Sequence, residues 1–158
     1  MPRLIKDGEV VVDEQWSAPL ADAELAPPGH INSLAQWEAR ADKSGSAVQL
    51  EPGDAVAPLL DHLDDITLVA INFPVFTDGR GFSYARELRE RGYRGEIRAV
   101  GAFIRDQLHY LHRCGFNAFQ LEDGSDLEEA LQSLYVFDES YQAAVDQPQP
   151  LFRRRAAE

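Results

Sequence analysis

The sequence is poor in cysteine, and this shortage excludes two kinds of redox centre. One cysteine, Cys114, stands among the 158 residues, so neither a disulfide within the chain nor a Cys-x-x-Cys pair can form. Because an iron–sulfur cluster needs several thiolates, we expect no intrinsic iron–sulfur cluster. The identity of any cofactor therefore stays unknown from the residues.

Positive charge and long apolar runs are scarce as well. The 15 Lys and Arg side chains stand against 27 Asp and Glu side chains, which gives a net charge of −12 and argues against a nucleic-acid partner. Apolar runs such as residues 66–71 are too short to span a bilayer, and residues 1–13 contain no signal-peptide core. We therefore expect a cytoplasmic protein with no membrane partner.

What the sequence does contain is a regular alternation of short apolar runs and amphipathic segments. It predicts one α/β domain over residues 1–158, with a mainly parallel sheet of repeated β-α units. We expect an N-terminal β-hairpin and loop over 1–46, the parallel core over 47–136 and an extended tail over 137–158. Core strands are predicted at residues 47–50, 66–73, 96–101 and 117–121, and helices at about 56–63, 81–91, 104–114 and from 125 onward. The sequence decides neither the strand order nor whether the sheet is open or forms a partial barrel.

The first 46 residues carry weaker patterns. Residues Leu4–Trp16 predict two short strands around a turn at Asp7-Gly8. A loop rich in proline and alanine follows, and residues 31–42 then predict a short helix with Ser33 as its cap.

A Gly-Arg-Gly turn follows the predicted strand at 66–73 and opens the next helix. In parallel sheets ligands gather at the carboxyl ends of strands, where helix N-termini point N–H groups outward. In one interpretation, Gly79 and Gly81 let the backbone approach a small oxyanion that Arg80 and Ser83 also bind. In the other, the glycines only turn the chain and Asp78 caps the helix. Both interpretations stay open.

The remaining residues of this helix exclude one further possibility. A dinucleotide fingerprint would have glycine where Tyr84 stands, and no acidic residue follows at the expected distance, so we reject a Rossmann site. Arg86 is either part of the anion site or an ordinary surface residue that pairs with Glu90.

A similar corner follows the predicted strand at 96–101. It places Arg105, Asp106 and Gln107 at the start of the next helix. Two arginines at adjacent helix N-termini oppose the usual preference for acids there, and a bound anion would offset this. The alternative is that Arg105 pairs with a neighbouring acid. The candidate anion-binding residues are thus Asp78, Gly79, Arg80, Gly81, Ser83, Arg86, Arg105, Asp106 and Gln107; no catalytic residue is identified.

Two histidines, His109 and His112, lie near Cys114 on one predicted helix. No carboxylate or further histidine falls at a suitable spacing, so no metal site is predicted. We expect the histidines at the surface or at a boundary, and the cysteine to be a small buried residue.

Two strings of residues carry a resemblance to a known family. The first, FTDGRGFS-AR-LR, covers residues 76–89, and the second, RAVG---RDQL--L-RCGF, covers residues 98–116. With LIKDGEVVVDEQW at the N-terminus and SYQAAVDQPQPLFRRR in the tail, they resemble the bacterial family called domain of unknown function 934. Its members are described as oxidoreductases involved in sulfite reduction. The resemblance implies a sulfite or nitrite reductase as partner.

The residues qualify that description. Reduction of sulfite to sulfide transfers several electrons and needs a relay of redox cofactors, for which this chain has neither the cysteines nor a nucleotide fingerprint. We therefore expect an accessory protein of assimilatory sulfite reduction that binds a small oxyanion or sulfur metabolite, or docks on the reductase. The alternatives are a non-catalytic interaction module with a structural Gly-Arg-Gly turn, and an oxidoreductase that uses flavin or nicotinamide. The tail could pack on a partner subunit in a homodimer.

Overall fold

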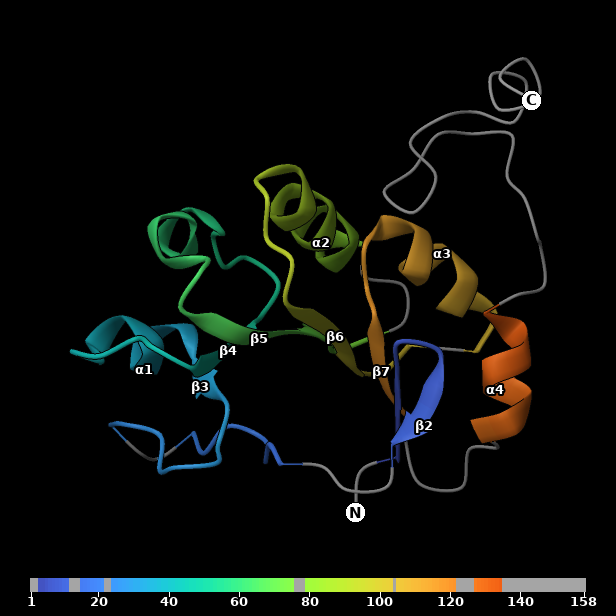
Figure 1. Cartoon of the computed structure of the whole chain (residues 1–158), viewed down its shortest axis with the longest axis horizontal. Coiled ribbons are helices and arrows are strands. Elements are labelled where there is room, and N and C mark those ends of the chain that lie inside the picture. The colour runs from blue at the N-terminus through green and yellow to red at the C-terminus, as the bar shows by residue number, and fades with distance from the viewer. Residues whose placement is uncertain are drawn as a thin grey trace.

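A sheet with the strand order β2-β1-β7-β6-β5-β4-β3 forms the centre of the molecule (Figure 1). The computed structural model describes residues 3–11, 15–21, 24–75, 79–103, 105–121 and 127–134. Strands β3 to β7 run parallel, whereas β1 pairs antiparallel with both β2 and β7. The predicted α/β fold with a mainly parallel sheet and an N-terminal hairpin is confirmed; the predicted tail, residues 137–158, lies outside the described residues. The strands are β1 Arg3–Lys6, β2 Glu9–Val11, β3 Asn32–Ser33, β4 Ser46–Leu50, β5 Ile66–Phe73, β6 Glu96–Gly101 and β7 Ala118–Leu121.

The helices follow the predicted pattern with local differences. Residues 57–62 form a 3₁₀ helix that has a proline in its first turn. Residues 105–107 form a single 3₁₀ turn that directly precedes α3, as is common at helix N-termini. The predicted cap is present: Gln36 N donates to Ser33 Oγ at 3.2 Å, and Ser33 N donates to Gln36 Oε1 at 2.8 Å. The elements are α1 Leu34–Ala39, η1 Ala57–His62, α2 Arg80–Glu90, η2 Arg105–Gln107, α3 Leu108–Cys114 and α4 Leu127–Ser133. Within the described ranges, no helix has the length and apolar character needed to cross a membrane.

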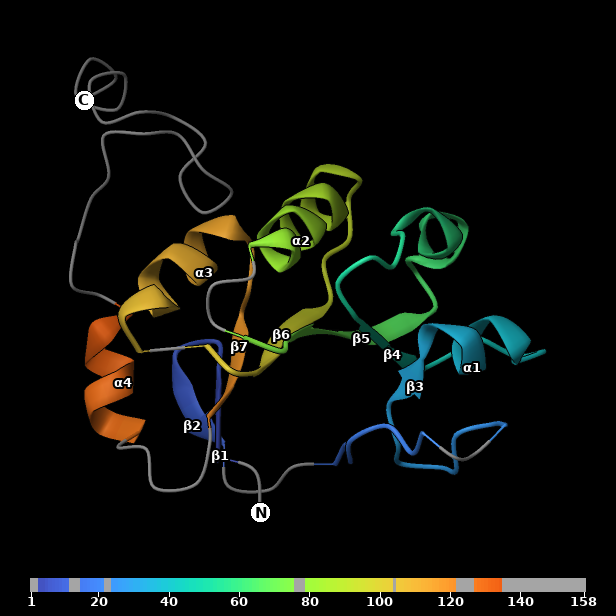
Figure 2. The same cartoon turned by 180° about the vertical axis from the view of Figure 1, so that it is seen from behind.

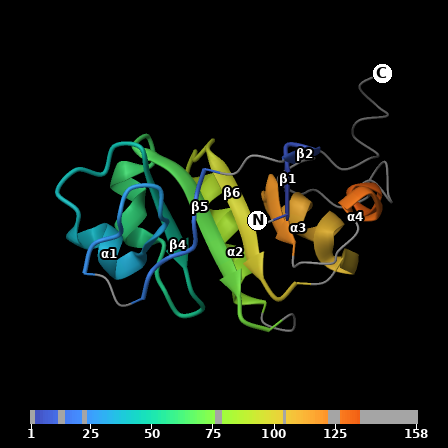
Figure 3. The ribbon, with the colours of Figure 1, turned by 90° about the horizontal axis from the view of Figure 1, so that it is seen from below.

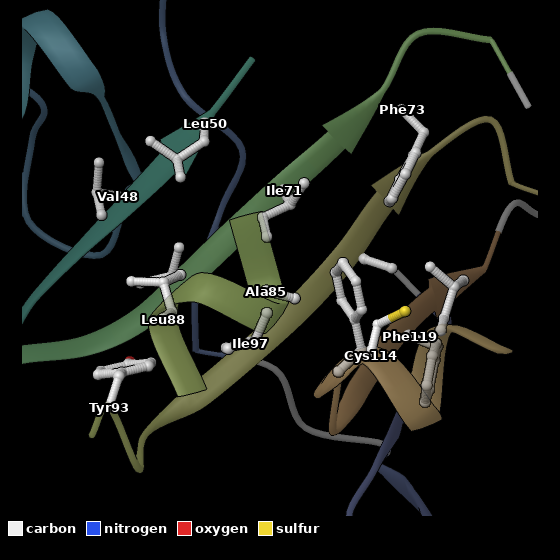
Figure 4. Packing of buried hydrophobic residues seen from close by; sticks show 14 of the residues in the cluster. Val48, Leu50, Ile71, Phe73, Ala85, Leu88, Tyr93, Ile97, Cys114 and Phe119 are labelled. Carbon is white, nitrogen blue, oxygen red and sulfur yellow. The ribbon is translucent and has the colours of Figure 1, made fainter. Parts of the chain in front are cut away.

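One face of the sheet carries α2, α3 and η1 (Figures 1 and 2). The parallel strands lie in chain order, so right-handed crossovers place every connecting helix on the same side. Alternate strand residues point towards these helices: Ile71 and Ile97 lie beside Ala85 and Leu88 of α2, and Phe119 lies beside Cys114 of α3 (Figure 4). This face holds the main hydrophobic core.

The other face has no helix against its centre and is crossed by residues 15–21 and 24–31 (Figure 3). Ser17 N donates to Gly29 O at 2.8 Å, and Ile31 N donates to Ser17 O at 2.9 Å, which joins the two ends of this segment. A small apolar cluster lies beneath it and contains Ile31, Ala47, Leu68, Ala70 and Val100, with Trp16 packed against it. We call this surface the helix-free face.

A buried ion-pair network joins the hairpin to the parallel strands on the helix-free face. Arg98 is 1% exposed, and its Nε and Nη2 atoms lie 2.7 and 2.6 Å from Glu96 Oε2. Lys6 Nζ lies 2.9 Å from the other oxygen of Glu96, and this hydrogen bond raises the pKa of Lys6. Since β7 separates β1 from β6 in the sheet, the contact spans that strand and ties β1 to β6.

The packing of α2 on β5 predicts a specific cost for a side chain at Gly81. A Cβ atom there would lie 2.7 Å from the Phe73 ring and 2.9 Å from Ile71 Cγ2. We expect Gly81→Ala to lower the free energy of unfolding by about 1–3 kcal/mol, because the helix must move off the strand. Urea denaturation measures this cost. The control is Gly79→Ala, whose nearest neighbour would lie at 3.8 Å and which should cost less than about 1 kcal/mol. Equal stabilities of the two variants would contradict the close helix–strand contact.

Tyr93 predicts a loss of stability in alkaline solution. Its hydroxyl lies 3.2 Å from Glu96 O and 3.3 Å from Ile66 O, and burial raises the pKa of Tyr93 well above its usual range. The unfolded chain ionises this phenol near pH ~10 whereas the folded chain keeps it protonated, so stability falls as pH rises above ~10. The slope from this group is about 1.4 kcal/mol per pH unit. Urea unfolding at about pH 9 and about pH 11 should show a smaller drop for Tyr93→Phe than for the native chain, and identical drops would refute this role.

Candidate functional site

The two predicted corners begin at neighbouring positions on one edge of the sheet. Phe73, the last residue of β5, is paired with Gly101, the last residue of β6. Ala102 N also donates to Phe73 O at 2.6 Å, so the chain segments that leave the two strands are hydrogen-bonded to each other. From this shared point one segment leads to α2 and the other to η2.

The N-terminus of α2 is exposed and carries a positive charge. Gly79 is the N-cap and makes no side-chain capping bond, the first turn contains no acidic residue, and Arg80 is exposed. The Ser83 hydroxyl donates to Arg80 O at 2.8 Å, so its proton is already used within the helix. The structure therefore makes Ser83 a weaker candidate donor than the N–H groups at the start of the helix.

The two glycines of the turn have different roles. Gly81 is buried against Phe73 and Ile71, so close packing of α2 on β5 explains why it lacks a side chain. Gly79 has φ −89° and open space around it, so neither packing nor backbone conformation requires glycine there. Asp78, the predicted cap in the structural interpretation, lies outside the described residues.

The second corner is described less fully. Asp106 is exposed and Gln107 is half-buried as the N-cap of α3, where it makes no side-chain capping bond. The side chain of Arg105 lies outside the described part of the chain.

Arg86 lies on the surface between α2 and α3. The pKa of Tyr110 is raised, mainly by neighbouring Cys114 and to a smaller extent by partial burial. The positive charge of Arg86 lies close enough to oppose this rise. Phe82 and Tyr110 join the two helices there, with ring centroids 5.0 Å apart. Arg86 thus faces the α2–α3 surface.

The histidines and the cysteine of α3 have structural surroundings. His109 Nδ1 lies 2.9 Å from Leu134 O and so joins α3 to the end of α4, and Cys114 is buried in the core. In the ranges that the structure describes, no three potential metal-ligating side chains lie together.

A pocket of about 600 Å³ lies at the same edge of the sheet but on the helix-free face. Gln49, Asn72 and Gln120 point into it, because they alternate along their strands with residues of the helix-side core. Its walls come from residues 18–21, Ile31 and the start of α1. We call it the acceptor pocket, defined by its polar residues Ser33, Gln49, Glu51, Asp54, Asn72 and Gln120.

Glu51 orients the amide side chains of the acceptor pocket. Asn72 Nδ2 donates to Glu51 Oε2 at 2.7 Å, and Gln49 Nε2 donates to Glu51 Oε1 at 3.0 Å. A carboxylate only accepts hydrogen bonds, so both amides must turn their NH₂ groups towards it and their oxygens elsewhere. The backbone N–H of Glu51 donates in turn to Asp54 Oδ2 at 2.8 Å. The pocket therefore presents acceptors and negative charge, the opposite of what an oxyanion needs.

The acceptor pocket and the α2 corner are mechanically linked. Tyr84, which follows the Gly-Arg-Gly turn on α2, accepts a hydrogen bond from Gly53 N at 3.0 Å in the loop after β4. Gly101 lines the pocket and also begins the second corner. None of the predicted anion-binding residues whose side chains the structure describes lines the pocket. The sequence motifs do not point to this pocket, although polar residues that alternate with apolar ones in the strands mark the face on which it lies.

Comparison with known proteins gives one match. A family model described as "Bacterial protein of unknown function (DUF934)" matches residues 47–152, which include both corners and every strand of the sheet from β5 to β7. No curated protein and no solved structure matches the chain.

Gly101 provides a test of how tightly the edge of the sheet is built. Its φ is +90°, and a Cβ atom there would lie 2.3 Å from Asn72 Oδ1 and 2.6 Å from Phe73 O. Gly53 has a similar φ of +96° but nothing within 4 Å, so Gly53→Ala measures backbone strain alone. We expect strain of about 1–2 kcal/mol in both alanine variants and a further loss of about 1–3 kcal/mol in Gly101→Ala, measured by urea denaturation. Equal losses in the two variants would show that Asn72 and Phe73 can move aside for a side chain at residue 101 without a cost in stability.

Proposed function

The chain belongs to the bacterial domain of unknown function 934 family, and on that premise we propose that it is an accessory protein of assimilatory sulfite reduction. It binds a small oxyanion or sulfur metabolite at the corner before α2. The sulfite assignment follows the description of the family's members. The oxyanion assignment follows from the residues at the corner.

The observation that carries the proposal is the pairing of Phe73 with Gly101. Because β5 and β6 end side by side, the Arg80 corner and the corner that contains Arg105 leave the sheet at one point. Backbone N–H groups at the start of a helix attract anions, and an arginine adds a fixed charge beside them. Sulfite, sulfate and phosphorylated sulfur metabolites all present oxygen atoms that suit such donors.

In this proposal the electrons come from the partner reductase. The one cysteine of the chain is buried in the core, where it packs as a small apolar side chain. The role of the protein would be to hold or deliver a sulfur oxyanion. Its net charge of −12 favours docking on a basic surface of that reductase.

Calorimetry with sulfite, sulfate and adenylyl sulfate tests the oxyanion assignment. We expect at least one of these to bind the native protein, and Arg80→Ala to weaken that binding about tenfold, as expected for loss of a charge-assisted hydrogen bond. Arg91→Ala is the matched control, because Arg91 is also exposed but lies at the opposite end of α2. If Arg80→Ala and Arg91→Ala bind the anion equally, the α2 corner is not the site.

Failure of all three anions to bind would leave the interaction module as the function. A pull-down with sulfite reductase then decides, because retention that depends on charge should weaken as salt rises.

A further inference from the structure

We propose that the acceptor pocket on the helix-free face is a second binding site, specific for a small organic cation such as an amine or amidine on an apolar body. This inference is independent of the oxyanion assignment, because the acceptor pocket shares no residue with the described part of the α2 corner, residues 79–83.

The size and position of the pocket suit a small-molecule ligand. Its volume of about 600 Å³ lies in the range that such sites usually occupy. It opens at the carboxyl ends of β4, β5, β6 and β7, where α/β sheets generally present their ligands. Because α2, α3 and η1 lie on the other face, a ligand would reach the pocket from the helix-free face (Figures 1 and 2).

The walls provide apolar contact on two sides. Ile31 and Val100 belong to the buried cluster of the helix-free face, and Leu34 comes from the first turn of α1. Residues 18–21 close the side opposite the strands. Burial of a ring or a short alkyl chain against such a surface is favourable, because it removes apolar area from water.

The polar groups select the charge of the ligand. Glu51 and Asp54 carry two carboxylates, and none of the residues that line the pocket, all from the described part of the chain, is basic. The hydrogen bonds from Asn72 and Gln49 to Glu51 use one N–H of each NH₂ group and turn these groups towards the carboxylate, which leaves the amide oxygens as acceptors. A ligand rich in N–H donors satisfies these acceptors, whereas the carboxylates of Glu51 and Asp54 repel an anion.

Benzamidine and benzoate form a matched pair of probes, with the same ring and opposite charge. In a two-dimensional NMR titration, we expect benzamidine to bind in the millimolar range and to shift the side-chain amide signals of Gln49, Asn72 and Gln120. Benzoate should leave these signals unchanged. Equal binding of the two probes, or no binding of benzamidine, would overturn the proposal.

Two variants assign the binding to this pocket. Glu51→Gln removes the central charge and should weaken benzamidine binding about tenfold, whereas Glu90→Gln removes an exposed carboxylate on α2 and should change nothing. Ala35→Phe places a ring in the pocket from an exposed position on α1 and should abolish binding without altering any charge.

The outcomes separate this site from the proposed oxyanion site. If Glu51→Gln disturbs the fold, the Ala35→Phe titration decides, and unchanged benzamidine binding in that variant refutes the pocket as the site. Arg80→Ala should leave benzamidine binding unchanged, and Ala35→Phe should leave anion binding unchanged. Either site can therefore fail while the other stands.

Discussion

The order of the parallel strands is the constraint on which the rest of this structure depends. Strands β3 to β7 follow one another across the sheet in chain order, and right-handed crossovers then place all connecting helices on one face. The opposite face must be covered by other means. Here an extended segment, a small apolar cluster and a buried Glu96–Arg98 pair cover it. The strand order alone therefore explains why helices cover one face of the sheet and not the other.

That difference gives one edge of the sheet two kinds of chemistry. On the helix side, the start of α2 presents N–H groups and Arg80, which suit negative charge. On the helix-free side, Glu51 and the amides that it orients present acceptors, which suit positive charge. Asn72 and Gly101 stand between the two, at the ends of β5 and β6. The side chain of Asn72 and the backbone of Phe73 lie so close to Gly101 that a Cβ atom would not fit there.

The sequence predicted the elements well and the pocket not at all, for physical reasons. A continuous β-branched and apolar run identified β5 at its observed bounds, and the repeat of the β-α unit identified β6 at its observed bounds. Ser33 caps α1 as expected. These are local properties. Whether Gly81 served a ligand or packing depended on the ring of Phe73, which lies across the helix–strand contact. The acceptor pocket depended on strand order and on the path of residues 15–31, whose proline and alanine content specifies no path. The oxyanion role stays a prediction, since Asp78 and the Arg105 side chain lie outside the described residues.

The pairing of β1 with β7 has a consequence for the way the protein is made. Residues 3–6 leave the ribosome well before their partners at 118–121, so this contact forms only after the strands between them have been synthesised. Until then β1 has only β2 beside it, and its other side, which carries the fully buried Leu4 and Ile5 of the finished fold, has no strand to pair with. The nascent chain must keep this apolar strand from associating with other chains while it waits. The pairing of β1 with β7 is thus a late event in biosynthesis, because it waits until β7 has been made.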